Sequence, residues 1–275
     1  MKLDEVSLSD LWNIQKKKPK MQVLPLFKSH YSIARSILTL EKAKDSKENG
    51  PDSIIDIALE NGLKRVVLIE DGMSGFLEAY KNCQAAELEL IFGVRLTFCS
   101  DIQDKSEESL AKNHKLIIKV KNSKGYSRLI KIHSRAAKDG FYYEPRLDFK
   151  NLQEFWSEED LQLCIPFYDS FIFKNRLTLG NCVPDFSFAK PIFFLEENEL
   201  LFDSIIRKRV KEYAQANDFP TLLTKSIYYK HRKDFKAFST FKCLRERSTL
   251  EAPKLEHFSS NNFCVESWKE QNATN

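Results

Sequence analysis

Several features that would identify a common protein class are missing from this chain. It has only 8 glycines in 275 residues and no low-complexity tract, which excludes a fibrous or disordered protein. No segment approaches the ~20 consecutive apolar residues of a membrane-spanning helix. The first ten residues, MKLDEVSLSD, include acidic side chains and lack the apolar core of a signal peptide. We therefore expect a cytoplasmic protein without a membrane partner.

Familiar catalytic motifs are also missing. The sequence contains no Walker A pattern, no G-x-G-x-x-G and no G-x-S-x-G, so nothing indicates an NTPase, a dinucleotide-binding fold or a serine hydrolase. It contains no D-x-D, the paired aspartates with which a polymerase holds two metal ions. The chain alone should therefore not polymerise nucleotides.

The composition that remains is that of a globular protein. Hydrophobic residues make up 42% of the chain, including 21 Phe, which is enough to fill a sizeable core. The 43 basic and 39 acidic residues leave a net charge of +4, which is compatible with nucleic acid nearby without requiring it. Six cysteines occur, none spaced as C-x-x-C, and most lie in apolar segments. Buried free thiols in a reducing compartment are the expected outcome.

Apolar runs and amphipathic segments alternate along the chain. Short apolar or alternating runs predict strands at 23–27, 65–69, 88–98, 115–120, 161–167, 191–195 and 220–224. Helical periodicity predicts helices at 51–60, 74–86, 126–137, 198–216 and 232–245, and the polar segment 101–113 is expected to be a loop. This order predicts an α/β protein with mostly parallel strands, and a barrel fits the element counts better than an open sheet.

Two segments carry a family resemblance. Residues 24–32 read LPLFKSHYS, and residues 125–148 read GYSRLIKIHSRAAKDGFYYEPRLD. Both resemble the polymerase and histidinol phosphatase (PHP) domain of bacterial DNA polymerase III alpha subunits, and the second segment is specific to that polymerase branch. The resemblance implies a distorted (β/α)7 barrel of the PHP type, whose functional residues lie at the carboxyl ends of the strands.

The resemblance also implies where metal ligands would lie, and most of those positions hold other residues. The family's first motif has two metal-binding histidines, its second an aspartate and a histidine, and its later strands a bridging glutamate, a histidine, an aspartate and a histidine. The corresponding positions in this sequence are Leu26, Lys28, Glu70, Asp71, Arg95, Lys115, Ser226 and Tyr228. Only Glu70 and Asp71 are plausible ligands, and we expect no metal cofactor.

Electrostatics supports that expectation. A lysine ammonium has no lone pair for a metal. Two unit charges of the same sign ~5 Å apart repel by roughly 3 kcal/mol at an effective dielectric constant of ~20, and a divalent ion doubles that cost. We therefore expect Lys28 or Arg95 to form an ion pair with Glu70 or Asp71 where the family holds metal.

The domain boundaries follow from the same pattern. Residues 1–21 are expected to form an extension, 22–270 the PHP-like domain, and 271–275 a tail. Within the extension, Leu11 and Trp12 either contact a partner protein, since an exposed Trp commonly anchors an interface, or dock back on the domain of the same chain. The lysine-rich run 16–20 is either a solvated linker or a phosphate contact.

The leading hypothesis is a catalytically inactive PHP-domain protein with a degenerate active site. It would act through protein–protein interaction in DNA replication or repair, with a polymerase or a proofreading exonuclease as partner, and it could bind nucleic acid weakly. The rival hypothesis is a phosphoesterase or 3′–5′ exonuclease that uses Mn or Zn at a reduced site of Glu70, Asp71 and His30. A further alternative concerns Tyr142, Tyr143 and Arg146, which either have a structural role, as we expect, or stack on nucleic acid.

Overall fold

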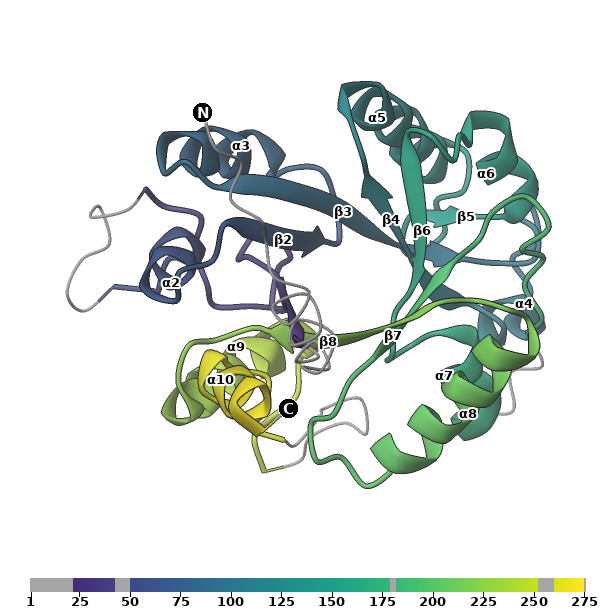
Figure 1. Ribbon diagram of the computed structural model, residues 1–275. Coiled ribbons are helices and arrows are strands. Elements are labelled where there is room, and N and C mark those ends of the chain that lie inside the picture. The colour runs from purple at the N-terminus through teal and green to yellow at the C-terminus, as the bar shows by residue number, and fades with distance from the viewer. Residues whose placement is uncertain (1–21, 43–49, 179–181, 252–259, 275) are drawn as a thin grey trace, which may run out of the picture.

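The computed structural model describes residues 22–42, 50–178, 182–251 and 260–274. The partner candidates Leu11 and Trp12 and the lysine-rich run 16–20 lie outside the described residues. Seven strands close into a barrel with helices around it, in the order β1-β2-β3-β4-β6-β7-β8 and back to β1 (Figure 1). These strands are Leu24–Phe27, Arg65–Glu70, Glu89–Phe98, His114–Val120, Leu161–Ile165, Ile192–Leu195 and Thr221–Ile227. The expected α/β barrel is confirmed.

One barrel strand runs against the others. Strand β4 is antiparallel to both of its neighbours, β3 and β6, whereas the other pairings within the ring are parallel. The amino end of β4 therefore lies beside the carboxyl end of β3, and Lys115 pairs in register with Thr97. A short strand β5 (Arg146–Leu147) adds to the same end of β3. The end of the barrel where these chain ends meet is called the barrel mouth below.

The predicted helices are present, with some shifts in their bounds. They are α2 (Ile54–Glu60), α3 (Phe76–Ala85), α5 (Ser123–Lys138), α8 (Asp203–Ala216) and α9 (Phe235–Glu246), the last preceded by a 3-10 turn, η1 (Arg232–Asp234). Helix α8 begins at Asp203 and not at 198, because the Asp203 carboxylate accepts hydrogen bonds from the backbone N–H groups of Asn198 and Leu200 and holds that segment as a loop.

Four helices within the described residues were not predicted. They are α4 (Glu107–Ala111), α6 (Phe149–Phe155), α7 (Phe171–Thr178) and α10 (Val265–Thr274). Helix α4 lies in the polar segment that we expected to be a loop, so that expectation was wrong. The Ser106 side chain caps this helix by accepting from the Ser109 N–H, and two glutamates in the first turn face the positive end of the helix dipole.

Two apolar layers hold the fold together. Inside the barrel, Leu26, Val67, Ile69, Ile117, Cys164 and Phe194 form a buried cluster. A larger cluster lies between the barrel and the helices around it. All six cysteines have free thiols, as expected, and five of them are buried.

The amino-terminal strand is fixed by the carboxyl-terminal helix. The indole Nε1 of Trp268 donates to the carbonyl oxygen of Val23 over 2.8 Å, and the Asn272 side chain accepts from the Val23 N–H over 2.9 Å. Both of these side chains belong to helix α10, which ends at Thr274. Within the part of the chain that the structure describes, no helix combines the length and the apolar character needed to cross a membrane.

Candidate functional site at the barrel mouth

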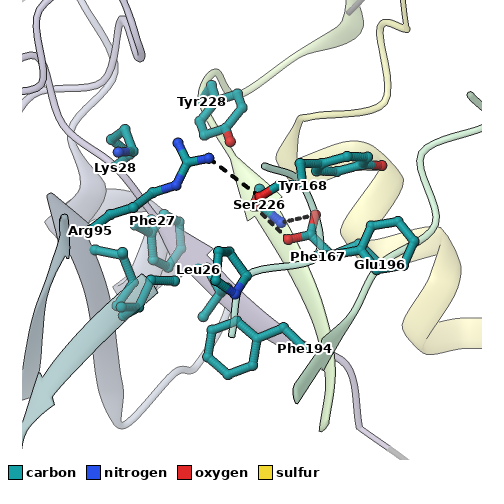
Figure 2. Close-up of a pocket in the computed structure, with 13 residues that line it drawn as sticks. Leu26, Phe27, Lys28, Arg95, Phe167, Tyr168, Phe194, Glu196, Ser226 and Tyr228 are labelled. Atoms are coloured by element: carbon teal, nitrogen blue, oxygen red, sulfur yellow. Dashed lines mark hydrogen bonds between the residues drawn. The ribbon is translucent and has the colours of Figure 1, made fainter. Parts of the chain in front are cut away.

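The structure brings the positions singled out in the sequence to one end of the barrel. Lys28 directly follows β1, Asp71 directly follows β2, and Lys115 is the second residue of the reversed strand β4. Arg95 and Ser226 lie within β3 and β8. A small cavity at this end is lined by five of the eight expected positions, namely Leu26, Lys28, Arg95, Ser226 and Tyr228 (Figure 2).

Lys28 and Asp71 form the first ion pair of the mouth. The Nζ atom of Lys28 lies 2.6 Å from Oδ1 of Asp71, and the two side chains are 6% and 35% exposed. Burial alone would raise the pKa of Asp71, but the charges of Lys28 and Arg95 outweigh it and hold that pKa well below its usual range. Burial lowers the pKa of Lys28, partly offset by Asp71. This is one of the pairs that the sequence predicted.

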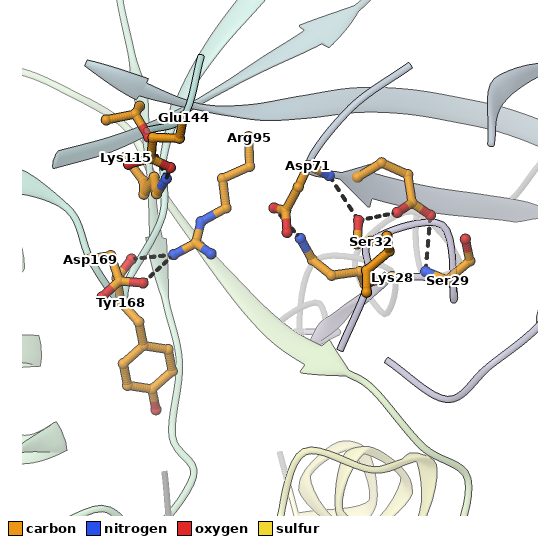
Figure 3. Close-up of polar contacts among 12 residues, drawn as sticks. Lys28, Ser29, Ser32, Asp71, Arg95, Lys115, Glu144, Tyr168 and Asp169 are labelled. Carbon is orange, nitrogen blue, oxygen red and sulfur yellow. Dashed lines mark hydrogen bonds and ion pairs between the residues drawn. The ribbon is translucent and has the colours of Figure 1, made fainter. Parts of the chain in front are cut away.

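Glu70 is buried beside this pair, but its carboxylate accepts hydrogen bonds from the loop that follows β1. Its carboxylate accepts from the Ser29 N–H over 2.9 Å and from the Ser32 hydroxyl. The same hydroxyl accepts from the Asp71 N–H over 2.8 Å, so Ser32 connects the two acidic residues (Figure 3). Both carboxylates that the sequence left as possible metal ligands therefore already have protein partners.

Arg95 forms the second ion pair, with a partner that we did not predict. Its Nη2 atom lies 2.5 Å from Oδ2 of Asp169 and 3.4 Å from the carbonyl oxygen of Tyr168. Of the two cations named in our expectation, Lys28 pairs with Asp71, and Arg95 pairs with Asp169 because the loop after β6 carries that aspartate across the mouth. Burial would lower the pKa of Arg95, but Asp169 and Asp71 raise it overall.

Lys115 forms a third pair on the same side. Its Nζ atom lies 2.7 Å from Oε2 of Glu144 and also donates to the Thr97 hydroxyl (Figure 3). Burial and the nearby charge of Arg95 lower the pKa of Lys115, while Glu144 opposes that shift. All three cations at ligand positions thus have a carboxylate partner within 3 Å.

The far side of the cavity is a hydrogen-bond network around the buried Glu196 carboxyl group. The Ser226 hydroxyl donates to Oε1 of Glu196 over 2.7 Å, and the Ser226 N–H and the Asn198 amide donate to Oε2 over 3.1 Å each. Burial raises the pKa of Glu196 in spite of these hydrogen bonds. Burial also raises the pKa of Tyr228 to about 12, with Glu196 contributing.

Three acidic residues of the mouth escaped the sequence analysis, namely Glu144, Asp169 and Glu196. Asp169 and Glu144 lie on loops. Tertiary packing brings each loop to its cation, and no local sequence pattern predicts that contact. Glu196 was different, because it directly follows strand β7. Residues at the carboxyl ends of barrel strands are where function is expected, so the position of Glu196 was a usable signal.

The arrangement does not fit a metal cluster. His30 is exposed, its ring packs on Tyr31 with 4.5 Å between centroids, and it does not join Glu70 and Asp71. His114 points away from the mouth, where its buried ring contacts the Lys112 carbonyl and the Cys182 thiol. Across the described residues, no three His, Cys, Asp or Glu side chains are placed to hold one ion. Two or three divalent ions require many converging oxygen and imidazole ligands.

The cavity itself is small. Its volume is about 40 Å³, and Figure 2 shows Arg95 reaching into it from one side with Ser226 and Glu196 on the other. An enclosed water molecule needs roughly 10–15 Å³ on the same measure, so there is room for a few waters.

Comparison with known proteins agrees with this fold. Residues 44–176 match the family model of the PHP domain. The chain is 26% identical over 227 residues to the DNA polymerase III subunit alpha of Aquifex aeolicus, covering 77% of this chain and 19% of that protein. The corresponding subunit of Borreliella burgdorferi is 25% identical over 230 residues, covering 79% and 20%. That of Thermus aquaticus is 26% identical over 211 residues, covering 72% and 17%.

The similarity is therefore to one part of much longer proteins. The chain spans about a fifth of the length of the curated relatives it matches. The resemblance drawn from the two sequence segments is confirmed by these matches.

Proposed function

This chain is a relative of the PHP domain of bacterial DNA polymerase III alpha subunits, and we propose that it is catalytically inactive. Its role is that of an interaction module in DNA replication or repair, in the cytoplasm. The partner is a polymerase or a proofreading exonuclease. The observation that carries the proposal is the Lys28–Asp71 ion pair, which lies where the family's first and second motifs hold metal.

The charges support the loss of metal chemistry. Lys28, Arg95 and Lys115 bring three positive groups to ligand positions, and each is paired with a carboxylate. A divalent ion ~5 Å from one of these groups would meet a repulsion of roughly 6 kcal/mol at an effective dielectric constant of ~20. One oxygen of Asp71, Oδ1, is already engaged by the Lys28 ammonium.

The preserved parts of the fold support an interaction role. The barrel closes, its interior is filled by apolar side chains, and the mouth is closed by ion pairs and hydrogen bonds within the chain. A domain whose role is to bind another protein has to keep its fold, but it does not need the side chains that bind metal. The relatives are named as polymerase subunits, which makes the replication machinery the first place to look for a partner.

The catalytic half of the proposal is tested by metal content and nuclease activity. Purified protein, dialysed against Mn or Zn, is analysed for bound metal and incubated with a labelled single strand. A Glu70→Ala/Asp71→Ala variant is assayed beside it, and Glu107→Ala/Glu108→Ala, on the exposed helix α4, is the matched control. We expect less than one metal ion per chain and the same background degradation in all three proteins.

The opposite result would favour the rival enzyme. Stoichiometric metal, with degradation that only the Glu70→Ala/Asp71→Ala variant loses, means that the reduced site is active. The interaction half is tested separately, by affinity capture from the native cell. Recovery of a polymerase or exonuclease subunit supports it, and recovery of neither under conditions that retain known replication complexes contradicts it.

A further inference from the structure

Helix α5 has an unusual charge distribution. Its sixteen residues, Ser123–Lys138, include five Lys or Arg and no Asp or Glu. The two arginines are paired, Arg128 with Asp160 and Arg135 with Asp139 and Glu154. The three lysines, Lys124, Lys131 and Lys138, are exposed and form no ion pair with any residue that the structure describes.

These lysines lie on one face of the helix. They are seven residues apart, so they follow one another along the axis at intervals of roughly 10 Å. The exposed residues Ser127 and Ser134 lie between them on the same face, while Leu129 and Ile132 pack into the core on the other side. We call Lys124, Ser127, Lys131, Ser134 and Lys138 the lysine face.

Helix stability does not account for this face. A negative side chain is favourable in the first turn of a helix, and a lysine there opposes the helix dipole. The first turn of α5 contains Lys124 and no acidic residue. The first turns of α2, α3, α4, α8 and α10 each contain an acidic residue, whereas those of α6, α7 and α9 lack one, as that of α5 does.

Exposed aromatic rings follow the lysine face directly in the chain. Phe141 is 55% exposed and Tyr143 is 83% exposed. The ring of Tyr142, between them, makes cation–π contacts. The Nζ atom of Lys105 lies 5.6 Å and the Cζ atom of Arg146 lies 5.3 Å from its centroid. Tyr143 has a φ of 61°, a conformation that bulky residues rarely adopt, and its ring lies against that of Tyr142 with 4.5 Å between centroids.

We propose that the lysine face and the rings of Phe141 and Tyr143 form a binding surface for single-stranded nucleic acid. Lysines spaced along one line match the charge of a phosphate backbone, and flat exposed rings accept unpaired bases by stacking. The aromatic rings favour a single strand over a duplex, whose bases are already stacked. They also favour nucleic acid over an acidic peptide, which would need the lysines alone. This goes beyond the docking role proposed above and does not depend on the barrel mouth.

The lysine face is tested by charge reversal. Fluorescence anisotropy measures binding of a labelled 20-nucleotide oligothymidine between 50 and 200 mM salt. Wild type is compared with Lys124→Glu/Lys131→Glu/Lys138→Glu and with Lys81→Glu/Lys211→Glu/Lys236→Glu, which reverses three exposed lysines on α3, α8 and α9. Losing three phosphate contacts should lower the slope of log K against log salt by about 2, at ~0.7 per contact, and weaken binding at 50 mM salt at least tenfold. The control variant should lose less than threefold.

The aromatic part is tested at one residue. Tyr143→Asn tolerates the left-handed backbone and removes the ring, so affinity for the single strand should fall about tenfold. Tyr143→Phe should bind like wild type. A matched duplex should bind at least tenfold more weakly than the single strand, and thermal unfolding checks that each variant is folded.

Several outcomes would overturn the proposal. One is no binding of the oligothymidine at 50 mM salt, and another is an equal loss in both triple variants, which would indicate net charge alone. Equal affinity for duplex and single strand, unchanged by Tyr143→Asn, would exclude the stacking surface. Competition by polyglutamate as effective as competition by oligothymidine would identify a general surface for acidic polymers.

Discussion

The Nζ atom of Lys28 lies 2.6 Å from Oδ1 of Asp71, directly after two neighbouring parallel strands. The lysine side chain is almost completely buried, whereas about a third of the Asp71 side chain reaches solvent. A charge buried this far is tolerated because a partner of opposite sign is within hydrogen-bond distance. The mouth of the barrel is therefore stabilised by charge pairing within the chain.

Removing one partner of this pair should cost stability. Lys28→Met leaves Asp71 without its ammonium, and we expect the free energy of unfolding to fall by about 2 kcal/mol, below the value for a fully buried pair because Asp71 is partly exposed. The double variant Lys28→Met/Asp71→Asn should recover at least half of that loss. Urea denaturation of the single and double variants measures both values.

The matched control is an exposed ion pair. Arg209 and Glu212 lie 2.9 Å apart on helix α8 with about half of each side chain in solvent. Arg209→Met should change the free energy of unfolding by no more than about 0.5 kcal/mol. If Lys28→Met is equally harmless, the ion pair does not stabilise the mouth.

Acid should weaken the mouth in a defined pH range. The net effect of their cationic partners is to lower the pKa values of Asp71, Asp169 and Glu144, although burial opposes that shift in each case. A carboxyl group with a lowered folded-state pKa stabilises the fold above its unfolded pKa, near ~4, and loses that contribution as the pH falls further. The stability difference between wild type and Asp71→Asn should therefore be constant from pH 7 to 5 and shrink below pH ~4. Urea midpoints at pH 7, 5, 4 and 3 test this, and a difference that stays constant to pH 3 would contradict it.

The sequence predicted the barrel strands and five of the helices because these segments have clear periodicity. It could not reveal the direction of β4, since alternation of apolar and polar residues looks the same in a parallel and an antiparallel strand. The helices that we did not predict are short or have a weak amphipathic periodicity. Helix α6, for example, has seven residues and depends on the Asp148 cap, which accepts from the Asn151 N–H.

At the mouth, the sequence located the cationic residues more reliably than the carboxylates that pair with them. The family resemblance located Lys28, Arg95 and Lys115, and simple electrostatics required carboxylates near them. Asp71 could be named because it lies in a motif. Asp169 and Glu144 could not, because each reaches its cation from a loop whose course is decided by tertiary packing. Asp169 also adopts a left-handed backbone with a φ of 58°, which no local sequence feature specified.

A buried lysine outside the ion pairs gives a prediction at alkaline pH. Lys225 is fully buried in β8, where its Nζ atom donates to the Glu197 carbonyl oxygen over 2.9 Å. Burial lowers the pKa of Lys225 to about 8, although Glu196 opposes the shift. A lysine whose folded-state pKa is below its unfolded value near ~10.4 favours folding increasingly as the pH rises between the two. Relative to Lys225→Met, wild type should therefore gain up to about 3 kcal/mol in the free energy of unfolding between pH 7 and pH 10.5. Parallel stability curves for the two proteins would show that the pKa of Lys225 is not lowered.

A glycine decides how closely helix α5 approaches the barrel. A Cβ atom built on Gly125 would lie 2.1 Å from the carbonyl oxygen of Asp160, which also accepts from the Lys121 N–H. Alanine is favoured over glycine in a helix by ~1 kcal/mol, so propensity alone predicts that Gly125→Ala stabilises the protein. The close approach reverses the sign of this stability change, because the backbone of α5 or of Asp160 must move to make room for the Cβ atom. We expect the free energy of unfolding to fall by about 2 kcal/mol. Gly72→Ala is the control, since its added Cβ would meet nothing nearer than the His133 ring at 3.8 Å. Gly125→Ala should also displace the lysine face, so thermal unfolding and oligothymidine binding should be affected together. An unchanged melting temperature in Gly125→Ala would show that the helix can shift at no cost.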